Sequence, residues 1–387
     1  MDRLEDEKKY LIDIAKDKTY QNQFDDYHKE FSKWRTKKGN PYGYSFVHDT
    51  REHTYVDGEG YYQRSADAAE RKALVKCLGL LGIILIFMLT IDGIISLILY
   101  RIFQDPGAYA IYYSKIDAPT YEFTPILVLL YCSMNLFKYL AAFGIFIRFT
   151  GIPLKVAAPV PKGARLSKSG IFLILVILVF SRVFNYIISL VFGLINLDCV
   201  YAIAIHDPNN NLSDLIYLIF NCVLVSAVSE LLFRGAIMQT FRQFGDTFAM
   251  LVSGIAFSLS YYDISSMGYA VLCSATLGLF TIRTGSLKSA IIMRITASVS
   301  GYALTRLVID SFTNGRIVEV IICTFIMSVA AFIFARLMCN GKWAFSVKDD
   351  PSELSTGEKL KLFFTTNSIV IWLVGVAGMF FLIMRFK

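Results

Sequence analysis

Histidine is scarce in this chain, and charged residues of either sign are sparse. Only 18% of the 387 residues are charged, and only nine are proline. No long apolar run contains a histidine; the four histidines are His28, His48, His53 and His206. The seven cysteines are scattered and form no Cys-x-x-Cys pair. This pattern excludes a membrane-embedded metal centre built on histidine, and it disfavours a cysteine metal site or a histidine-activated thiol.

Apolar residues dominate the rest of the chain. Hydrophobic residues make up 55% of it and its mean hydropathy is +0.51, which is beyond the composition of soluble globular proteins. A membrane-spanning helix needs about 20 apolar residues. The apolar runs are 77–100, 124–147, 170–195, 214–238, 247–262, 266–282, 288–309, 316–338 and 364–385. The sequence therefore predicts an all-α polytopic membrane helix bundle of eight or nine transmembrane helices, with nine preferred; the two shortest runs could be tilted, broken or re-entrant.

Lysine and arginine collect in some connecting segments and avoid others. The basic segments are 148–168, 339–361 and the turns at Arg242 and at Arg283 to Lys288. The segments 197–213 and 261–268 contain neither residue. Because basic loops tend to stay in the cytoplasm, we expect a cytoplasmic amino terminus and an outer carboxyl terminus in a bacterial plasma membrane, although Arg385 and Lys387 fit that orientation poorly.

The net charge of +7 requires no nucleic acid partner, because cytoplasmic loops that face anionic lipid explain it. No cleavable signal peptide is visible before the first apolar run, which we expect to anchor the chain. The lipid bilayer is therefore the first partner that the sequence predicts.

The first 76 residues predict a cytoplasmic tail with two parts. Apolar positions recur at helical spacing from Leu4 to Trp34 and indicate one or two amphipathic helices. From Asn40 to Arg64 the chain is rich in Gly and Tyr, with Asp57-Gly58 between two tyrosines, which indicates a small hairpin or an irregular loop. The tail either docks a partner or the membrane surface, or it packs as a cap on the bundle.

Charged residues inside the apolar runs are the candidate functional residues. Glu230 and Arg234 are four residues apart, so they share one face of a helix. Each costs roughly 2.5–3.5 kcal/mol at the centre of a bilayer, so such residues are functional-site hypotheses by default. Asp92, Lys138 and Arg182 also lie in predicted spans; they could pair across the bundle or line a transport cavity, but no inverted repeat or pair of broken half-helices supports a transporter.

The stretch from about Leu215 to Ala303 resembles the CPBP family, which contains CAAX-type proteases and bacteriocin-processing or Abi proteins. The family pattern is Glu-Glu-x-x-x-Arg on one helix, Phe-x-x-x-His on a second, and His followed four residues later by Asn on a third. The matching residues are Glu230, Arg234, Gly235, Phe257 and the turn Arg283-Thr284-Gly285-Ser286-Leu287. The resemblance implies the fold of a helical intramembrane metalloprotease.

Four positions depart from the family pattern: they are Ser229, Tyr261, Arg294 and Ser298. The resemblance implies that these positions surround a water that the first Glu activates, while the His residues bind metal or stabilise the oxyanion. Peptide hydrolysis needs such a base and such donors. Neither Ser nor Tyr is that base at neutral pH without a partner, and Arg binds no divalent cation. We therefore expect no intact catalytic set, no metal and no other cofactor.

A hydrogen-bonded plug is our hypothesis for the altered site. In this hypothesis Arg294 pairs with Glu230, and Tyr261, Ser229 and Ser298 complete the network. A first alternative is that the cluster only holds helices together, as polar residues do in lipid. A second is that a ligand or peptide carboxylate binds the two arginines.

The predicted divisions are the tail 1–76, the first three transmembrane helices at 77–212, a CPBP-like core at 213–310, and the C-terminal transmembrane helices at 311–387. The predicted function is a pseudoprotease that acts as a scaffold or regulator and binds a membrane protein or peptide segment. One alternative is an active intramembrane endopeptidase that uses Glu230; another is a bacteriocin-immunity or transport protein. This step rests on analogy, because a fold alone does not fix function.

Overall fold

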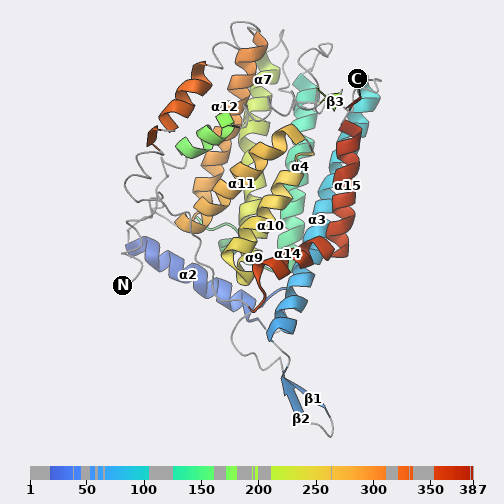
Figure 1. Cartoon of the computed structure of the whole chain (residues 1–387), viewed down its shortest axis with the longest axis vertical. Helices are drawn as coiled ribbons and strands as arrows, with labels where there is room; N and C mark the ends of the chain where they lie inside the picture. Colours follow the sequence, from blue (N-terminus) through green and yellow to red (C-terminus); the bar gives the residue numbers. More distant parts are fainter. Residues whose placement is uncertain are drawn as a thin grey trace.

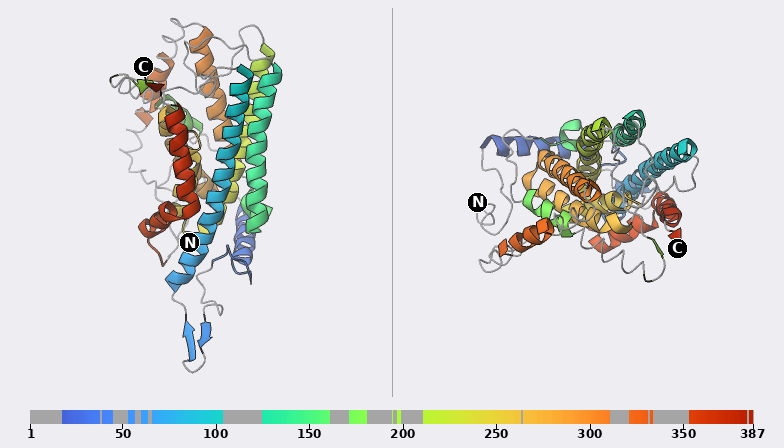
Figure 2. Two further views of the ribbon diagram at one scale, coloured as in Figure 1. Left: turned by 90° about the vertical axis from the view of Figure 1, so that its right-hand side faces the viewer. Right: turned by 90° about the horizontal axis from the view of Figure 1, so that it is seen from above.

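A computed structural model shows a helix bundle. It describes residues 18–37, 39–44, 53–56, 60–63, 66–103, 125–160, 171–180, 194, 197–198, 211–262, 264–310, 321–330, 332–333, 353–383 and 385–386. The α-helices have the bounds α2 Lys18–Arg35, α3 Ala66–Phe103, α4 Pro125–Thr150, α5 Leu154–Ala157, α7 Asn211–Tyr217, α8 Ser226–Glu230, α9 Met238–Phe241, α10 Asp246–Leu259, α11 Ile264–Thr284, α12 Leu287–Asp310, α14 Thr356–Thr365 and α15 Asn367–Ile383. Figures 1 and 2 show α3, α4 and α7 running along the long axis of the molecule.

The expected all-α membrane bundle is confirmed, and the described residues contain three helices long and apolar enough to cross a membrane. These are Asp67–Ile95, Pro125–Thr150 and Asn211–Phe244. The pair α14 and α15, bent by 68°, would make a fourth. Of the predicted runs 170–195 and 316–338, only the helices Ile171–Phe180 and Ile321–Ala330 lie within the described residues. The count of eight or nine spans therefore stays a prediction.

Two short sheets accompany the helices. Strands β1 (His53–Val56) and β2 (Gly60–Gln63) pair antiparallel with Tyr55 opposite Tyr61, which confirms the hairpin reading of this part of the tail. Strands β3 (Leu197–Asp198) and β4 (Arg385–Phe386) pair antiparallel near the carboxyl terminus. The last strand therefore lies at the end of the bundle opposite to α2 (Figure 1).

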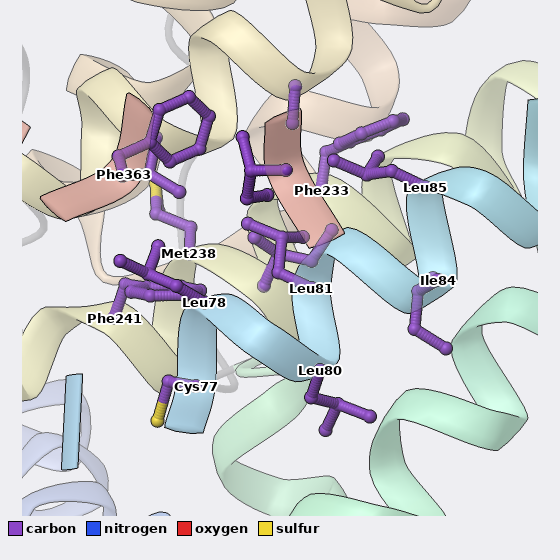
Figure 3. Close-up of a cluster of buried hydrophobic side chains, with 14 of the residues drawn as sticks. Cys77, Leu78, Leu80, Leu81, Ile84, Leu85, Phe233, Met238, Phe241 and Phe363 are labelled. Carbon is purple, nitrogen blue, oxygen red and sulfur yellow. The ribbon is translucent and has the colours of Figure 1, made fainter. Parts of the chain in front are cut away.

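The main hydrophobic core lies where α3 packs against α15 and the middle of the chain. Figure 3 shows side chains from α3, including Leu78 and Leu81, next to Phe233, Phe241 and Phe363. All five side chains are fully buried. This packing places the helix that carries Glu230 and Arg234 at the centre of the bundle.

Small residues allow α3 and α15 to approach closely. A Cβ added at Gly82 would collide with the Ser368 side chain, and one at Gly375 would collide with Leu89. The Ser368 hydroxyl also donates a hydrogen bond of 3.0 Å to the Gly79 carbonyl. Small residues at helix contacts are the usual way in which helices associate in lipid.

Helix α10 is too short to cross a membrane. Its 14 residues span about 21 Å at 1.5 Å per residue, whereas the hydrocarbon core is about 30 Å thick. The chain then turns through Tyr262, which has a positive φ of 53°, and returns as α11 packed against α10. The run 247–262 therefore contains a helix too short to span a membrane, with Tyr261 in the turn that follows it. The tilted, broken and re-entrant alternatives for the two short runs stay predictions.

The described part of the tail caps one end of the bundle. The Tyr27 hydroxyl of α2 donates to Gln239 Oε1 at 2.5 Å, and Trp34 Nε1 donates to the Thr150 carbonyl at 3.0 Å. Burial raises the pKa of Tyr27 above its ordinary value, which keeps the hydroxyl protonated as a donor. Helix α2 confirms the predicted amphipathic helix from Lys18 onward; residues 1–17 lie outside the described residues.

The predicted basic segments meet at this same end. The Leu287 amide of the turn before α12 donates to the Pro159 carbonyl at 2.9 Å. Lys359 Nζ of α14 contacts Glu70 at 3.2 Å and the Phe244 carbonyl at 2.5 Å. Segments that the charge pattern assigned to one side of the membrane therefore lie together in the structure.

A buried ion pair joins α3 and α4. Lys138 Nζ lies 2.6 Å from Asp92 Oδ1, and both side chains are almost fully buried. Of the two alternatives predicted for Asp92, Lys138 and Arg182, pairing across the bundle is what the first two residues show, while Arg182 lies outside the described residues.

We expect Lys138→Met to destabilise the protein by about 3–5 kcal/mol, because Asp92 then stays buried without its cation. The double variant Asp92→Leu/Lys138→Met removes both charges and should recover most of that loss. Denaturant unfolding of the purified protein in detergent measures both. A double variant as unstable as Lys138→Met would contradict this account of the pair.

Candidate functional site

The helix Asn211–Phe244 contains two π-helical segments that flank the first motif. These are η4 (Leu218–Val225) and η5 (Leu231–Ile237), with α8 between them; the 3₁₀ turn η6 (Arg242–Phe244) ends the helix. A π segment is rare and occurs frequently at functional sites. Wider turns change which side chains share a face, so Glu230 and its neighbours are positioned by an irregular helix rather than by regular α spacing.

Glu230 and Arg234 form an ion pair within their own helix. Arg234 Nη1 lies 3.0 Å from Glu230 Oε1, and both side chains are fully buried. Glu230 Oε2, Arg234 Nε and Arg234 Nη2 are buried and have no hydrogen-bond partner. The pair therefore leaves one acceptor and two donor atoms unused, which is an expensive arrangement in a low-dielectric interior.

Phe257 of α10 connects the two arginines of the site. The guanidinium carbon of Arg234 lies 4.2 Å from the centre of the Phe257 ring, and that of Arg294 lies 5.2 Å from it. The rings of Phe233 and Tyr261 both meet Phe257 edge to face, at 5.3 Å. Aromatic faces attract cations, so Phe257 brings the first and third motif positions around one ring.

Arg294 of α12 binds tyrosines and not Glu230. Its Nη2 donates to the Tyr261 hydroxyl and its Nη1 donates to the Tyr269 hydroxyl at 3.1 Å. Arg294 is near enough to interact electrostatically with Glu230, but they form no direct ion pair. The predicted Arg294–Glu230 pair is therefore wrong: Arg234 binds Glu230 Oε1 from the same helix, and Arg294 donates to the Tyr261 and Tyr269 hydroxyls.

Ser229 and Ser298 do not form the hydrogen bonds that the plug hypothesis predicts. The Ser229 hydroxyl donates to the Ser226 carbonyl at 2.8 Å, and the Ser298 hydroxyl lies 2.8 Å from that of Ser226. The Ser229 bond stays within its own helix, the Ser298 contact joins α12 to the motif helix, and neither serine bonds to Glu230. Of the predicted network, the structure brings together Tyr261 and Arg294 only.

Sequence reasoning missed Tyr269 and Ser226. The available signal for Tyr269 was a phenol within the apolar run 266–282, which needs a partner when it is buried. Ser226 lies three residues before Ser229, on the same side of the motif helix. Neither residue is part of the motif pattern, so only spatial proximity identifies it.

The turn before α12 sets the place of Arg294. Gly285 has a positive φ of 60°, which favours glycine. The Thr284 hydroxyl accepts a hydrogen bond of 3.3 Å from the Ser286 amide. Nearby, a Cβ added at Gly235 would collide with the Ala157 carbonyl oxygen, so α5 packs directly on the motif helix.

The residues at this site do not fit the metal that the family resemblance implies. Arg294 and Tyr261 occupy the two histidine positions, and guanidinium is no ligand for a divalent cation. Within the part of the chain that the structure describes, no three His, Cys, Asp or Glu residues are grouped so as to hold a metal ion. The donor set instead offers hydrogen bonds and positive charge.

Comparison with known families identifies part of the chain. Residues 211–300 match the family model described as type II CAAX prenyl endopeptidase Rce1-like. The match contains the ion pair, Phe257, the turn before α12, Arg294 and Ser298, which confirms the resemblance drawn from the motifs. No curated protein and no solved structure matches the chain.

We expect Gly235→Ala to destabilise the fold by about 1–3 kcal/mol, because its methyl group overlaps a backbone oxygen that cannot rotate away. Gly144→Ala in α4 is the matched control, since nothing lies within 4 Å of its added Cβ; it should be neutral, or stabilising by up to about 1 kcal/mol. Thermal unfolding in detergent compares the two. Equal unfolding temperatures for the two variants would contradict this expectation, because α5 would then move away from the added methyl group without a loss of stability.

Proposed function

We propose, from the premise that residues 211–300 belong to the type II CAAX prenyl endopeptidase Rce1-like family, that this integral membrane protein is a non-catalytic scaffold or regulator. It binds a membrane protein or a peptide segment through the family core. The observation that carries the proposal is the hydrogen bond between Arg294 and Tyr261, because the two positions that should carry histidines are bonded to each other.

The remaining groups are poorly suited to hydrolysis. Glu230 is the only acidic residue among the described residues of the site, and one of its two carboxylate oxygens is held by Arg234, so only the other oxygen could take a proton from water. Ser229, at the position of the family base, donates to a backbone carbonyl. Binding, in contrast, requires no general base; it needs buried polar groups that a partner can satisfy.

One observation favours an endopeptidase as the second candidate. Glu230 Oε2 is buried without a partner, so it is chemically free to accept a proton from an attacking water. This candidate requires a peptide product that depends on the Glu230 carboxylate.

We expect the chain, purified from its native membrane in mild detergent, to carry one stoichiometric partner that Arg294→Ala loses. Tyr302→Phe is the control: Tyr302 lies on the same helix as Arg294, and the change removes its 2.8 Å bond to Asp214 of α7 but leaves the site intact, so this variant should retain the partner. Quantitative mass spectrometry of the three samples measures this. A partner bound equally by all three would place the contact outside the core and contradict the proposal.

A cleavage experiment separates the two candidates. The identified partner is reconstituted with wild type and with Glu230→Gln, and its fragments are analysed by mass spectrometry. The scaffold proposal expects an intact partner in both samples. A fragment that appears with wild type and disappears with Glu230→Gln would establish the endopeptidase instead.

A further inference from the structure

The charges around Phe257 do not balance. Two guanidinium groups, from Arg234 and Arg294, lie against its ring, and among the described residues Glu230 is the only carboxylate that pairs with either. The described residues of the site therefore carry one net positive charge. An uncompensated charge inside an apolar bundle is costly, so such a group is expected to find an opposite charge.

Arg294 holds the excess charge. Its contacts are two phenol oxygens, Tyr261 and Tyr269, and two aromatic faces. All of these groups are neutral. They solvate the guanidinium in part, but an ionised acceptor forms hydrogen bonds roughly twice as strong as neutral acceptors do.

The unused atoms of the site show the geometry that a ligand would meet. Arg294 Nε, Arg234 Nε and Arg234 Nη2 are buried donors with no hydrogen-bond partner, and Glu230 Oε2 is a buried acceptor with none. On Arg294, Nε and Nη2 form one side of the guanidinium fork, and Nη2 is held only by the Tyr261 hydroxyl. A planar carboxylate matches this side with two parallel hydrogen bonds.

The geometry points to a binding site for a carboxylate carried on an apolar chain, held by Arg294 with Arg234 on the same aromatic ring. One carboxylate neutralises the single excess charge, whereas a phosphate would reverse its sign. The carboxylate replaces the Tyr261 hydroxyl on Nη2 and takes the unused Nε. The carrier is apolar because the surrounding groups, Phe233 and Phe257 among them, are buried aromatic side chains.

Displacement of Tyr261 is the conformational step that this binding needs. Tyr261 precedes Tyr262, whose φ of 53° is a strained backbone conformation for a residue other than glycine. Both residues lie in the turn between α10 and α11, not within a helix. Such a turn can move its phenol without unwinding a helix.

This inference deepens the proposed function, because the carboxylate would be the feature by which the core recognises its partner. Two sources present the same chemistry: a fatty acid, and a hydrophobic peptide that ends in a free carboxylate. The full chain is purified in detergent and tested at pH 8 with tritiated palmitate, and separately with an apolar peptide that has a free or an amidated carboxyl terminus.

We expect wild type to bind at least one carboxylate ligand, and to bind its neutral counterpart (hexadecanol for palmitate, the amidated peptide for the free one) far more weakly. Arg294→Gln should weaken carboxylate binding by roughly 30-fold or more, as expected when one member of a buried charge pair is removed. Arg242→Gln is the matched control, because Arg242 pairs with Asp246 at 2.6 Å, away from the site. It should bind like wild type.

Binding of palmitate alone identifies a lipid carboxylate, and binding of the free peptide alone identifies a protein terminus; either supports the site. Equal binding of the neutral and the ionised ligand to wild type would overturn the proposed carboxylate site. This comparison uses wild type alone, so it holds even if Arg294→Gln fails to fold. Carboxylate binding together with Glu230-dependent cleavage would keep the site and reject the scaffold, so the two proposals fail separately.

Discussion

Burial of charge among apolar helices is the constraint on which the centre of this structure depends. Glu230 and Arg234 lie in the interior with no exposed surface, where neither charge is stable alone. Their spacing of four residues lets one helix pair the two charges without a second element. The close contact at Gly235 and the ring of Phe257 pack around this pair.

The Glu230–Arg234 pair leaves Arg294 of the third motif helix without a direct carboxylate partner among the described residues. Arg294 donates instead to the phenols of Tyr261 and Tyr269. The result is a cluster of two guanidinium groups, two phenols and one carboxylate around Phe257. This cluster offers hydrogen-bond donors and positive charge.

Local and periodic features were predictable from the sequence. Apolar runs identified the helices of the core. The Asp57-Gly58 sequence left a hairpin or an irregular loop open, and the hairpin that pairs Tyr55 with Tyr61 is present; the charges in the spans left pairing or a cavity open, and Asp92 pairs with Lys138. Each depends on the order of residues along the chain, or on the rule that a charge buried in lipid needs an opposite charge. The motif spacing likewise identified the family core.

Partner choice within the site was decided by the tertiary structure. The sequence determined which residues enter the bundle, because their type and spacing follow from the chain alone. It did not determine that Arg294 meets Tyr269, that Ser298 meets Ser226, or that α10 ends inside the bundle with Tyr261 at its turn. These contacts join helices that lie far apart along the chain, and a hydrogen bond forms only where packing brings donor and acceptor within about 3 Å.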